Sequence, residues 1–587
     1  MINMNRSLLI LYGSETGCAQ DVAETLGRQA RRRHFKIRSI AMDDYDKAQL
    51  LEEKLIIFVC STTGQGEEPA NMKKFWRYLL KKNLPRTLLN GVDCAVFGLG
   101  DSSYRKFNYP AKKLYKRLQQ LGANLIQTRG DGDDQHYQGL DGALLPWMDG
   151  LWKNVMEKYP LPENTTIIPD NELLPASFHM EFIDQIQEKA LLEEPPNHPG
   201  EFDMVVIENK RITADDHFQE VRHIVLRNDS DEFSYNPGDV AVITPQNIPS
   251  EVDGFLELMG WKELADKYIQ FSLNDKDKLL PYHWSKVMTF RDLFTYHLDI
   301  FGVPRRSFFE MLSYFSTNED HIERLREFIS PEGQEDMWKY CQRPRRTIAE
   351  VLFDFKPLNI PFDYILDLFP PLHPRSFSIA SSLKAHPHCM ELCIAIVKYK
   401  TILKRIRRGV LTKWISTLPT GTIIKRVRIV KGTMNLPPPE LPLIAIGPGT
   451  GVAPMRSFLE ERISNKSYNN VLFFGCRHKD KDFHYKQEWD DYANENKLKI
   501  FAAFSRDQDS KIYVQDIILQ QSALVWDMID EQQCKVVLSG SSGKMPEQVA
   551  YALKTVFMKE GGLTAEQAEE YFNNMNKTSQ YQEECWS

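Results

Sequence analysis

The feature that most constrains the fold is an alternation of short apolar runs with helical patterns over residues 1–153. The runs 8–12, 55–60 and 94–99 are almost continuously apolar, which is typical of strands buried on both faces. The segments between them repeat apolar residues at three- or four-residue spacing, which indicates amphipathic helices. The order strand, helix, strand predicts an α/β fold with a doubly wound parallel sheet, whose ligands bind at the carboxyl ends of the strands.

Polar, glycine-bearing loops follow four strands of this predicted sheet. The first loop, 14–19, offers hydroxyls and a helix N-terminus that suit a phosphate, but it lacks the lysine of an ATP-binding loop. The fourth, 130–134, is expected to be a loop after a strand over 125–128. A lone loop of this kind is commonly only a turn, whereas four successive ones predict an FMN site. Its expected residues are Ser14, Glu15, Thr16, Gly17, Cys18, Ala19, Ser61, Thr62, Thr63, Gly64, Leu99, Gly100, Asp101, Ser102, Ser103, Tyr104, Phe107, Asn108 and Asp134.

Residues 154–200 are rich in proline and acidic residues, so an extended linker is expected, either a hinge or a passive spacer.

Strand patterns in 201–435 predict a β-barrel, interrupted by a helical insertion over about 250–355. Within it, Arg375-Ser376-Phe377-Ser378 reads as a strand that offers a donor fork for a diphosphate, a flat ring and a hydroxyl. Gly409-Val410-Leu411-Thr412 opens a short helix whose N–H groups suit a pyrophosphate. Together the two segments suggest an FAD site.

Residues 436–587 are expected to form an α/β nucleotide-binding domain. The turn 447–454, which includes Thr450, lies between a strand and a helix, where glycines let backbone approach a pyrophosphate. Past a later strand end lie Ser505, Arg506, Lys511, Tyr513 and Gln515. A serine and two cations suit a ribose 2′-phosphate and outweigh the neighbouring Asp507, which predicts NADPH rather than NADH.

These motifs, in this order, resemble the diflavin reductases over almost the whole chain. The resemblance implies that Arg375 and the Gly409 turn bind FAD pyrophosphate, with Phe377 against the flavin ring and Ser378 near its N5. It implies further that Trp586 stacks on the FAD ring and moves aside for nicotinamide. Three positions depart from the family: Thr63 replaces an aromatic over FMN, Ser539 replaces a cysteine and Glu584 replaces an aspartate near the hydride path. Ser378, Trp586, Glu584 and Ser539 are thus the expected catalytic residues. Arg345 lies in an arginine cluster that either reaches FAD or is solvated.

The resemblance also implies an electron path from NADPH to FAD to FMN and then to a one-electron protein acceptor. The nearest subgroup serves cytosolic iron–sulfur protein assembly, with an iron–sulfur acceptor of the anamorsin type. A soluble P450-reductase-like enzyme, a methionine-synthase-reductase-like enzyme and a flavoprotein scaffold that does not turn over are the alternatives. Expected carboxylates around the FMN loops, either a docking rim for a basic partner or ordinary caps, are Glu15, Glu67, Glu68, Asp101, Asp131, Asp133 and Asp134.

The composition bears on which ligand classes and which cellular compartment are expected. A net charge of −7 does not point to nucleic acid or a membrane surface. The nine cysteines include no C-x-x-C pair, so reduced thiols, a cytoplasmic location and no metal site are expected, with a mitochondrial pool left open. The sequence has neither an apolar run of membrane-spanning length nor an expected N-terminal anchor.

Overall fold

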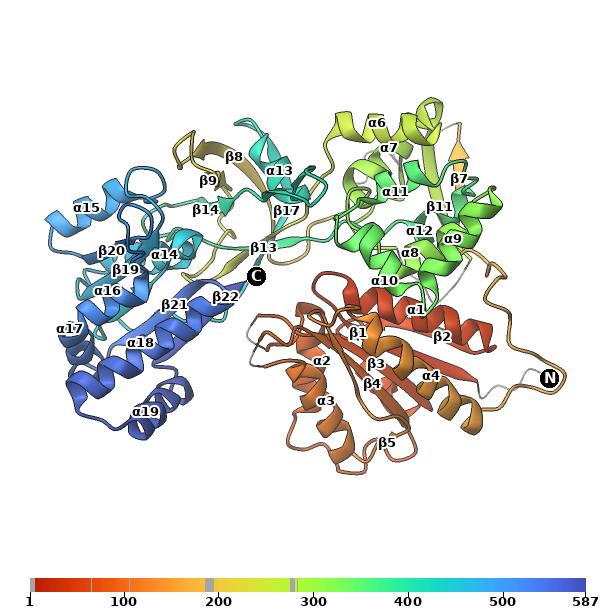
Figure 1. Cartoon of the computed structure of the whole chain (residues 1–587), viewed down its shortest axis with the longest axis horizontal. Helices are drawn as coiled ribbons and strands as arrows, with labels where there is room; N and C mark the ends of the chain where they lie inside the picture. Colours follow the sequence, from red (N-terminus) through yellow and green to blue (C-terminus); the bar gives the residue numbers. More distant parts are fainter. Residues whose placement is uncertain are drawn as a thin grey trace. The chain divides into compact units, whose positions relative to one another are not determined.

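The computed structural model describes residues 6–64, 66–104, 106–184, 195–274, 280–281 and 283–586. The chain divides into two compact units (Figure 1). The first comprises 1–195, 247–373 and 401–405, and the second 196–246, 374–400 and 406–587. Among the described helices, none is both long and apolar enough to cross a bilayer.

The first unit begins with the predicted parallel sheet, in the order β2-β1-β3-β4-β5, with β6 paired to β4. This is the flavodoxin order, in which the direction of strand addition reverses between the parallel neighbours β1 and β3. The strands are β1 (Ser7–Gly13), β2 (Lys36–Ala41), β3 (Leu55–Ser61), β4 (Asp93–Gly100), β5 (Asn124–Leu125) and β6 (Gly130–Asp133).

Helices cover both faces of this sheet because its central strands are apolar on both sides. Alternate residues of β3 such as Ile57 and Val59 pack with α1 and α4, whereas Ile56 and Phe58 pack with α2 and α3. Figure 1 shows these helices around the sheet. Their bounds are α1 (Cys18–Arg32), α2 (Lys73–Leu79), α3 (Tyr109–Gln120) and α4 (Asp141–Lys158).

The expected loop over residues 130–134 is wrong for its first four residues, which form strand β6. Alternating glycine and aspartate hides this strand from propensity-based reading. The glycines are required by close packing: a Cβ on Gly130 would lie 2.3 Å from the ring of Phe97 and 2.8 Å from that of Trp147. The expected strand over 125–128 is correspondingly short, since β5 ends at Leu125.

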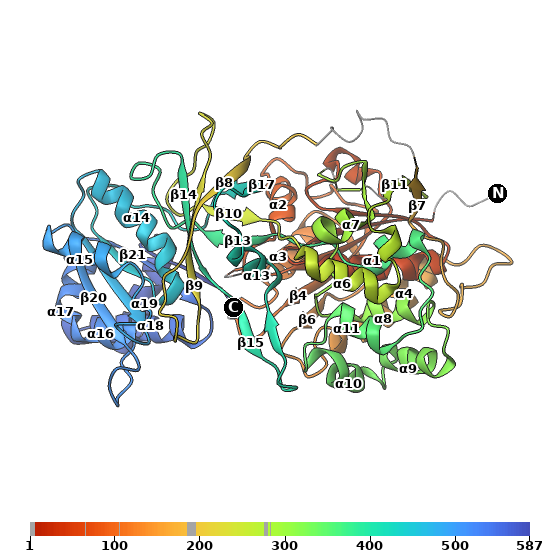
Figure 2. The ribbon, with the colours of Figure 1, turned by 90° about the horizontal axis from the view of Figure 1, so that it is seen from above.

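The helical insertion lies between β10 (Val240–Ile243) and β13 (Arg375–Ser378), and it belongs to the first unit. Its core is dense in aromatic rings, among them Phe255, Phe290, Phe294 and Phe309. Figure 2 shows the insertion in yellow-green and green. Its elements are α6 (Pro249–Met259), β11 (Tyr268–Leu273), β12 (Val287–Thr289), α7 (Phe290–Asp292), α8 (Arg306–Ser313), α9 (Glu319–Ile329), α10 (Gln334–Met337), α11 (Ile348–Asp354) and α12 (Ile365–Leu368), with single turns between some of them.

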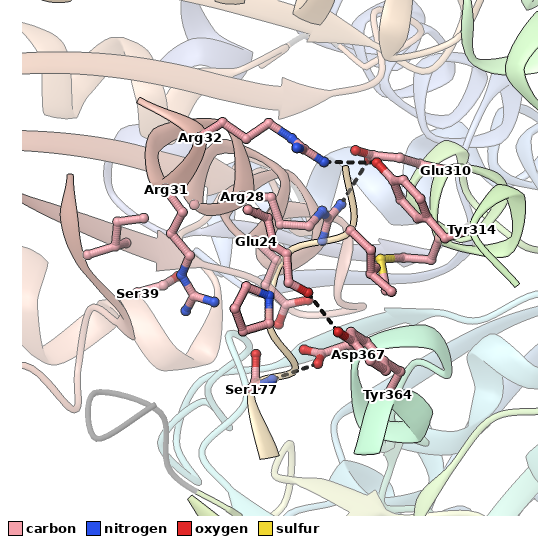
Figure 3. Close-up of a pocket in the computed structure, with 16 residues that line it drawn as sticks. Glu24, Arg28, Arg31, Arg32, Ser39, Ser177, Glu310, Tyr314, Tyr364 and Asp367 are labelled. Atoms are coloured by element: carbon pink, nitrogen blue, oxygen red, sulfur yellow. Dashed lines mark hydrogen bonds and ion pairs between the residues drawn. The ribbon is translucent and has the colours of Figure 1, made fainter. Parts of the chain in front are cut away.

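The segment expected to be a linker is held at several points. Strand β7 (Phe178–Ile183) pairs antiparallel with β11, and residues 185–194 lie outside the described residues. The part of the segment before β7 is held by Arg32 of α1, which is 1% exposed. Arg32 donates to the carbonyls of Pro169 (2.5 Å) and Glu172 (2.9 Å) in this segment and to the Tyr314 hydroxyl (2.8 Å). Figure 3 shows this region, where a small cavity of about 60 Å³ lies among side chains of α1, the linker and the insertion. The segment therefore packs along the unit from about residue 168 to 183.

The second unit begins with an antiparallel sheet in the order β13-β10-β17-β8-β9-β14. An isolated bridge between Ile379 and Leu392 brings the end of β13 to β14, so the two edges of the sheet approach barrel closure. The strands are β8 (Glu201–Arg211), β9 (Val221–Arg227), β10 (Val240–Ile243), β13 (Arg375–Ser378), β14 (Cys389–Ala395) and β17 (Ile423–Val430). The hairpin β15 (Lys398–Lys400) and β16 (Ile406–Arg408) precedes helix α13 (Val410–Ser416).

The C-terminal part is a parallel sheet in the order β20-β19-β18-β21-β22. Helices α14 and α15 pack on one face and α16 to α19 on the other. The strands are β18 (Leu443–Ile446), β19 (Asn470–Cys476), β20 (Lys499–Phe504), β21 (Lys535–Ser541) and β22 (Tyr581–Trp586). The helices are α14 (Val452–Ser464), α15 (Lys486–Asn494), α16 (Val514–Gln520), α17 (Ser522–Trp526), α18 (Lys544–Gly561) and α19 (Ala565–Lys577).

Candidate functional site

Three of the predicted FMN loops meet at the carboxyl edge of the first sheet. Strands β1, β3 and β4 are parallel neighbours, so their C-terminal loops are adjacent. The backbone N–H of Thr62 donates to the carbonyl of Leu99 (2.8 Å), and the Ser61 hydroxyl donates to the carbonyl of Gly13 (3.3 Å). The Ser14 N–H donates to Asn71 Oδ1 (2.8 Å). The structure thus gathers these loop residues into one place.

Buried polar atoms at this edge fit a phosphate-bearing, ring-containing ligand. Ser14 Oγ, Thr62 Oγ1 and Asn108 Oδ1 are buried and have no hydrogen-bond partner within the described part of the chain. Buried polar groups are costly without partners. Gly17, with φ at 84°, is the N-cap of α1, so the helix begins within the first loop and directs its N-terminus there. The donor set therefore suits FMN.

Other residues predicted to bind FMN differ in how they are held within the protein. Tyr104 is half-buried, and its N–H closes a turn onto the carbonyl of Asp101 (3.1 Å). Thr63 exchanges backbone hydrogen bonds with Glu67 (2.9 and 3.1 Å), which closes the second loop on itself. Asp134 lies at the end of β6, where its N–H donates to the carbonyl of Gly100 (2.9 Å). Phe107 precedes buried Asn108. Their contacts with flavin remain predictions.

The insertion contributes a residue that the sequence did not reveal. Arg305 donates to the carbonyls of Thr16 (3.2 Å) and Gly17 (3.3 Å). No spacing rule joins an arginine to a loop nearly 290 residues earlier, so only the tertiary structure could identify it. Arg345 lines a larger cavity of the same unit, about 570 Å³, together with Asp134 and Arg305. Its predicted role toward FAD stays a prediction.

The predicted FAD strand is the edge strand β13, paired with β10. Arg375 and Ser376 are exposed, whereas Phe377 and Ser378 are half-buried, with Phe377 packed against the barrel core. Gly409 is the N-cap of α13, as expected, and Leu411 is buried in the same core. Thr412 Oγ1 accepts from the Val397 N–H (3.1 Å), so its hydroxyl fixes the turn. A cationic fork beside a half-buried ring and a helix start suit a flavin with a pyrophosphate.

The glycine-rich turn of the nucleotide-binding domain is shaped by close packing. A Cβ on Gly451 would lie 2.1 Å from the carbonyl oxygen of Ser539, and one on Gly447 would lie 2.8 Å from that of Gly451. Glycines at both positions therefore let the turn containing Thr450 lie against the end of β21. Helix α14 begins directly after it at Val452. This cradle fits a pyrophosphate at a helix N-terminus.

The predicted 2′-phosphate residues follow β20. Ser505 is buried, Arg506, Lys511 and Tyr513 are exposed, and Gln515 lies in the first turn of α16. Asp507 is engaged within the protein: it accepts from the Lys479 N–H (2.8 Å) and contacts His478 Nδ1 (2.8 Å). The hydrogen bond from Lys479 holds the pKa of Asp507 below its usual value. With this carboxylate engaged within the protein, the exposed cations Arg506 and Lys511 favour a phosphate.

The chain end forms a strand rather than a frayed tail. Strand β22 pairs with β21, placing Glu584 beside Ser539 and Trp586 beside Ser541. Glu584 accepts from the Thr433 hydroxyl (2.9 Å), while Ser539 Oγ is buried and has no partner among the described residues. Trp586 is 38% exposed. Ser539, Glu584 and the Gly451 turn are therefore assembled in one place, and Ser378 lies on β13 of the same unit.

Comparison with known proteins agrees with this layout. Residues 10–147 match the flavodoxin family model, 195–414 the FAD binding domain model and 445–550 the oxidoreductase NAD-binding domain model. A protein from Xenopus laevis described as NADPH-dependent diflavin oxidoreductase 1 is 43% identical over 599 aligned positions, covering 99% of this chain and all of the relative. The chain belongs to the NADPH-dependent diflavin oxidoreductase family. Relatives of the same description from Mus musculus (41%) and Schizosaccharomyces pombe (40%) also align over 99% of this chain and over 99% and 100% of their own lengths.

Membership confirms the three-part fold, the cofactors FMN, FAD and NADPH, and the reductase activity. The individual site residues remain predictions, with the geometry above as their support.

Proposed function

We propose that this diflavin oxidoreductase delivers electrons in the cytoplasm to an iron–sulfur protein of the anamorsin type, and so serves iron–sulfur cluster assembly. The proposal concerns only the acceptor and its setting. The resemblance noted from the motif order is its starting point, and the charge around the FMN loops is the observation that carries it.

Carboxylates surround the carboxyl edge of the flavodoxin-like sheet. Glu15 accepts from the Ala70 N–H (2.9 Å), and Asp101 from the Ser103 N–H (2.8 Å). Burial opposes ionisation of Asp133, but hydrogen bonds from Ser102 and Gln135 hold its pKa below the usual value. Two others are paired: Glu68 with Lys113, and Asp131 with Arg129. The rim is thus less negative than the sequence count suggests, yet it still favours a basic acceptor face.

The chain's own residues supply binding and orientation for the chemistry. When bound, FAD would supply a two-electron acceptor for the hydride of NADPH, and FMN would supply a centre that releases electrons one at a time. Ser539 and Glu584 would lie beside the hydride path, and Trp586 would cover the flavin ring until nicotinamide displaces it. Thr63 stands where the family carries an aromatic, so it would cover less of the FMN ring and would favour electron exit at that loop.

The acceptor is tested by mixing the NADPH-reduced full-length protein with an anamorsin-type iron–sulfur protein in a stopped-flow instrument. Parallel reactions use a microsomal P450 and cobalamin-dependent methionine synthase. We expect the iron–sulfur protein to have the largest second-order rate constant, and that constant to fall as salt is raised. A larger constant with either other acceptor, or a salt-independent one, would overturn the proposal.

A further inference from the structure

Helix α14 and strand β13 are joined by a buried polar cluster. Helix α14 starts at the glycine-rich turn that would hold the nicotinamide cofactor, and β13 ends at Ser378, which would lie beside the flavin. The short segment after Ser378, Ala380 to Ser382, is fully buried. Its contacts with α14 connect the two half-sites.

Arg456 is the centre of this cluster and is only 5% exposed. Its Nη1 donates to the carbonyl of Ala380 (2.7 Å) and to Glu391 Oε2 (2.5 Å). Its Nη2 contacts Glu460 Oε1 (2.7 Å), and its Nε donates to Glu488 Oε2 (2.9 Å). One guanidinium thus links α14, α15, β14 and the segment that follows β13. Its several N–H donors in one plane allow it to contact all four segments at once.

The neighbouring residues repeat the link. The Ser457 hydroxyl donates to the carbonyl of Ser381 (2.6 Å), and Glu460 Oε2 accepts from the Ser382 N–H (2.8 Å). The Ser381 hydroxyl in turn accepts from the Glu391 N–H (2.9 Å). One backbone group of each of the three consecutive residues Ala380, Ser381 and Ser382 is therefore held by a side chain of α14. All of these residues are buried.

His386 completes the charge balance. Its Nδ1 lies 3.1 Å from Glu391 Oε1, and its Nε2 lies 3.0 Å from Glu460 Oε1. The three side chains are close enough to suggest a metal site. However, each ring nitrogen faces a different carboxylate, and Arg456 already contacts both carboxylates. Two acceptors for two ring nitrogens require both nitrogens to carry protons, so the arrangement fits an imidazolium.

We propose that Arg456 is a positioning residue for hydride transfer: with Ser457, Glu460 and the His386 imidazolium, it sets the flavin-bearing strand against the nucleotide-binding helix. The side chains of the cluster contact one another and the backbone of residues 380–382, so we expect their effect to be on the distance and angle between the two half-sites. The inference concerns the reductive half-reaction and is independent of which protein accepts electrons from FMN.

The test uses the flavin-loaded full-length protein with Arg456→Lys and Ser457→Ala. A lysine can contact only part of the cluster, and Ser457→Ala removes one hydrogen bond with little change in volume. His388→Asn is the matched control, since His388 is exposed on the same loop and its φ of 61° suits asparagine. Retained FAD, the NADP⁺ dissociation constant and the rate of FAD reduction are measured for each.

We expect both variants to retain FAD and to bind NADP⁺ within about twofold of the wild type, while FAD reduction slows about tenfold or more. The control should match the wild type. If Arg456→Lys fails to fold, Ser457→Ala decides. An unchanged reduction rate in a folded variant, or a rate loss that only follows lost FAD, would overturn the proposal.

The imidazolium is tested separately by pH. The hydrogen bond to Glu460 raises the pKa of His386 above its ordinary value, with Glu391 adding to the effect and burial and Arg456 opposing it. Two other titratable groups lie near this cluster: burial lowers the pKa of His223 and raises the pKa of Glu488. Because the pKa of His386 is higher in the folded than in the unfolded state, its protonation stabilises the folded protein fully below the unfolded pKa of about 6.5. This stabilisation is lost as the pH rises through the folded pKa. The melting temperature of His386→Gln should therefore fall furthest below wild type at low pH, with the gap closing as pH rises. A gap independent of pH would contradict the imidazolium.

Discussion

At the scale of single residues, we expect the choice between NADPH and NADH to depend on the charged residues that follow β20. Arg506 and Lys511 are exposed, and Asp507 is occupied by the Lys479 N–H. We expect Arg506→Ala to lower the ratio of kcat/KM for NADPH over NADH by about tenfold to a hundredfold, because a charged hydrogen bond contributes about 1.5–3 kcal/mol. Steady-state kinetics with both nucleotides measures the ratio. The NADH value serves as control and should stay constant, and an unchanged ratio would contradict the assignment of Arg506.

Trp586 offers a second residue-scale prediction. Its carbonyl accepts from the Ser542 N–H (2.7 Å), so Trp586→Ala keeps strand β22 while removing the ring. Because the ring would compete with nicotinamide for the flavin face, its removal should lower the NADH Michaelis constant about fivefold to tenfold. Initial-rate kinetics at fixed acceptor concentration provide the measurement. A Michaelis constant equal to that of the wild type would count against the gating role.

At the scale of elements, strand β6 shows how packing can override propensity. A Cβ at Gly130 would contact Phe97 and Trp147 closely, so Gly130→Ala should destabilise the flavodoxin-like domain by about 1–3 kcal/mol and weaken FMN binding at the adjacent loops. Gly254→Ala is the control, because a Cβ there meets nothing within 4 Å in helix α6, and alanine should stabilise that helix by about 0.5–1 kcal/mol. Denaturant unfolding followed by FMN fluorescence tests both. Equal stability of the two variants would contradict the packing argument.

Elements were predictable from sequence where local pattern and tertiary demand agree. Strands β1, β3 and β4 are buried on both faces, so their apolar runs were visible, and the glycines at 447 and 451 mark a turn that only glycine allows. Strand β6 could not be predicted, because its glycines are required by close packing and Asp133 accepts hydrogen bonds from loop N–H groups, so neither residue type signals a strand. Strand β7 was missed because its partner β11 lies about 90 residues away.

The site residues divide in the same way. Loop residues beside a strand end could be named from sequence, because topology alone places strand ends together. Arg305 and Arg456 could not, since each acts on segments far away in the chain. Arg456 contacts Ala380, 76 residues earlier, and Arg305 contacts Gly17, 288 residues earlier. A buried or bridging arginine looks in sequence like any surface cation.

At the scale of the whole molecule, the proposed electron path uses two different flavins in one chain. The flavodoxin-like edge of the first unit suits a flavin with a single phosphate, while β13 and α13 of the second suit one with a pyrophosphate. The nucleotide-binding sheet supplies a third phosphate site. A flavin can accept two electrons as a hydride and release them singly, so FAD facing NADPH and FMN facing the acceptor would join a two-electron donor to a one-electron acceptor.

The most direct test is therefore the flavin content of the purified full-length protein. Flavins released by heat or acid are separated by chromatography and quantified against protein concentration. We expect one FMN and one FAD per chain, both reduced when NADPH is added before release. A colourless protein, or one carrying a single kind of flavin, would contradict it.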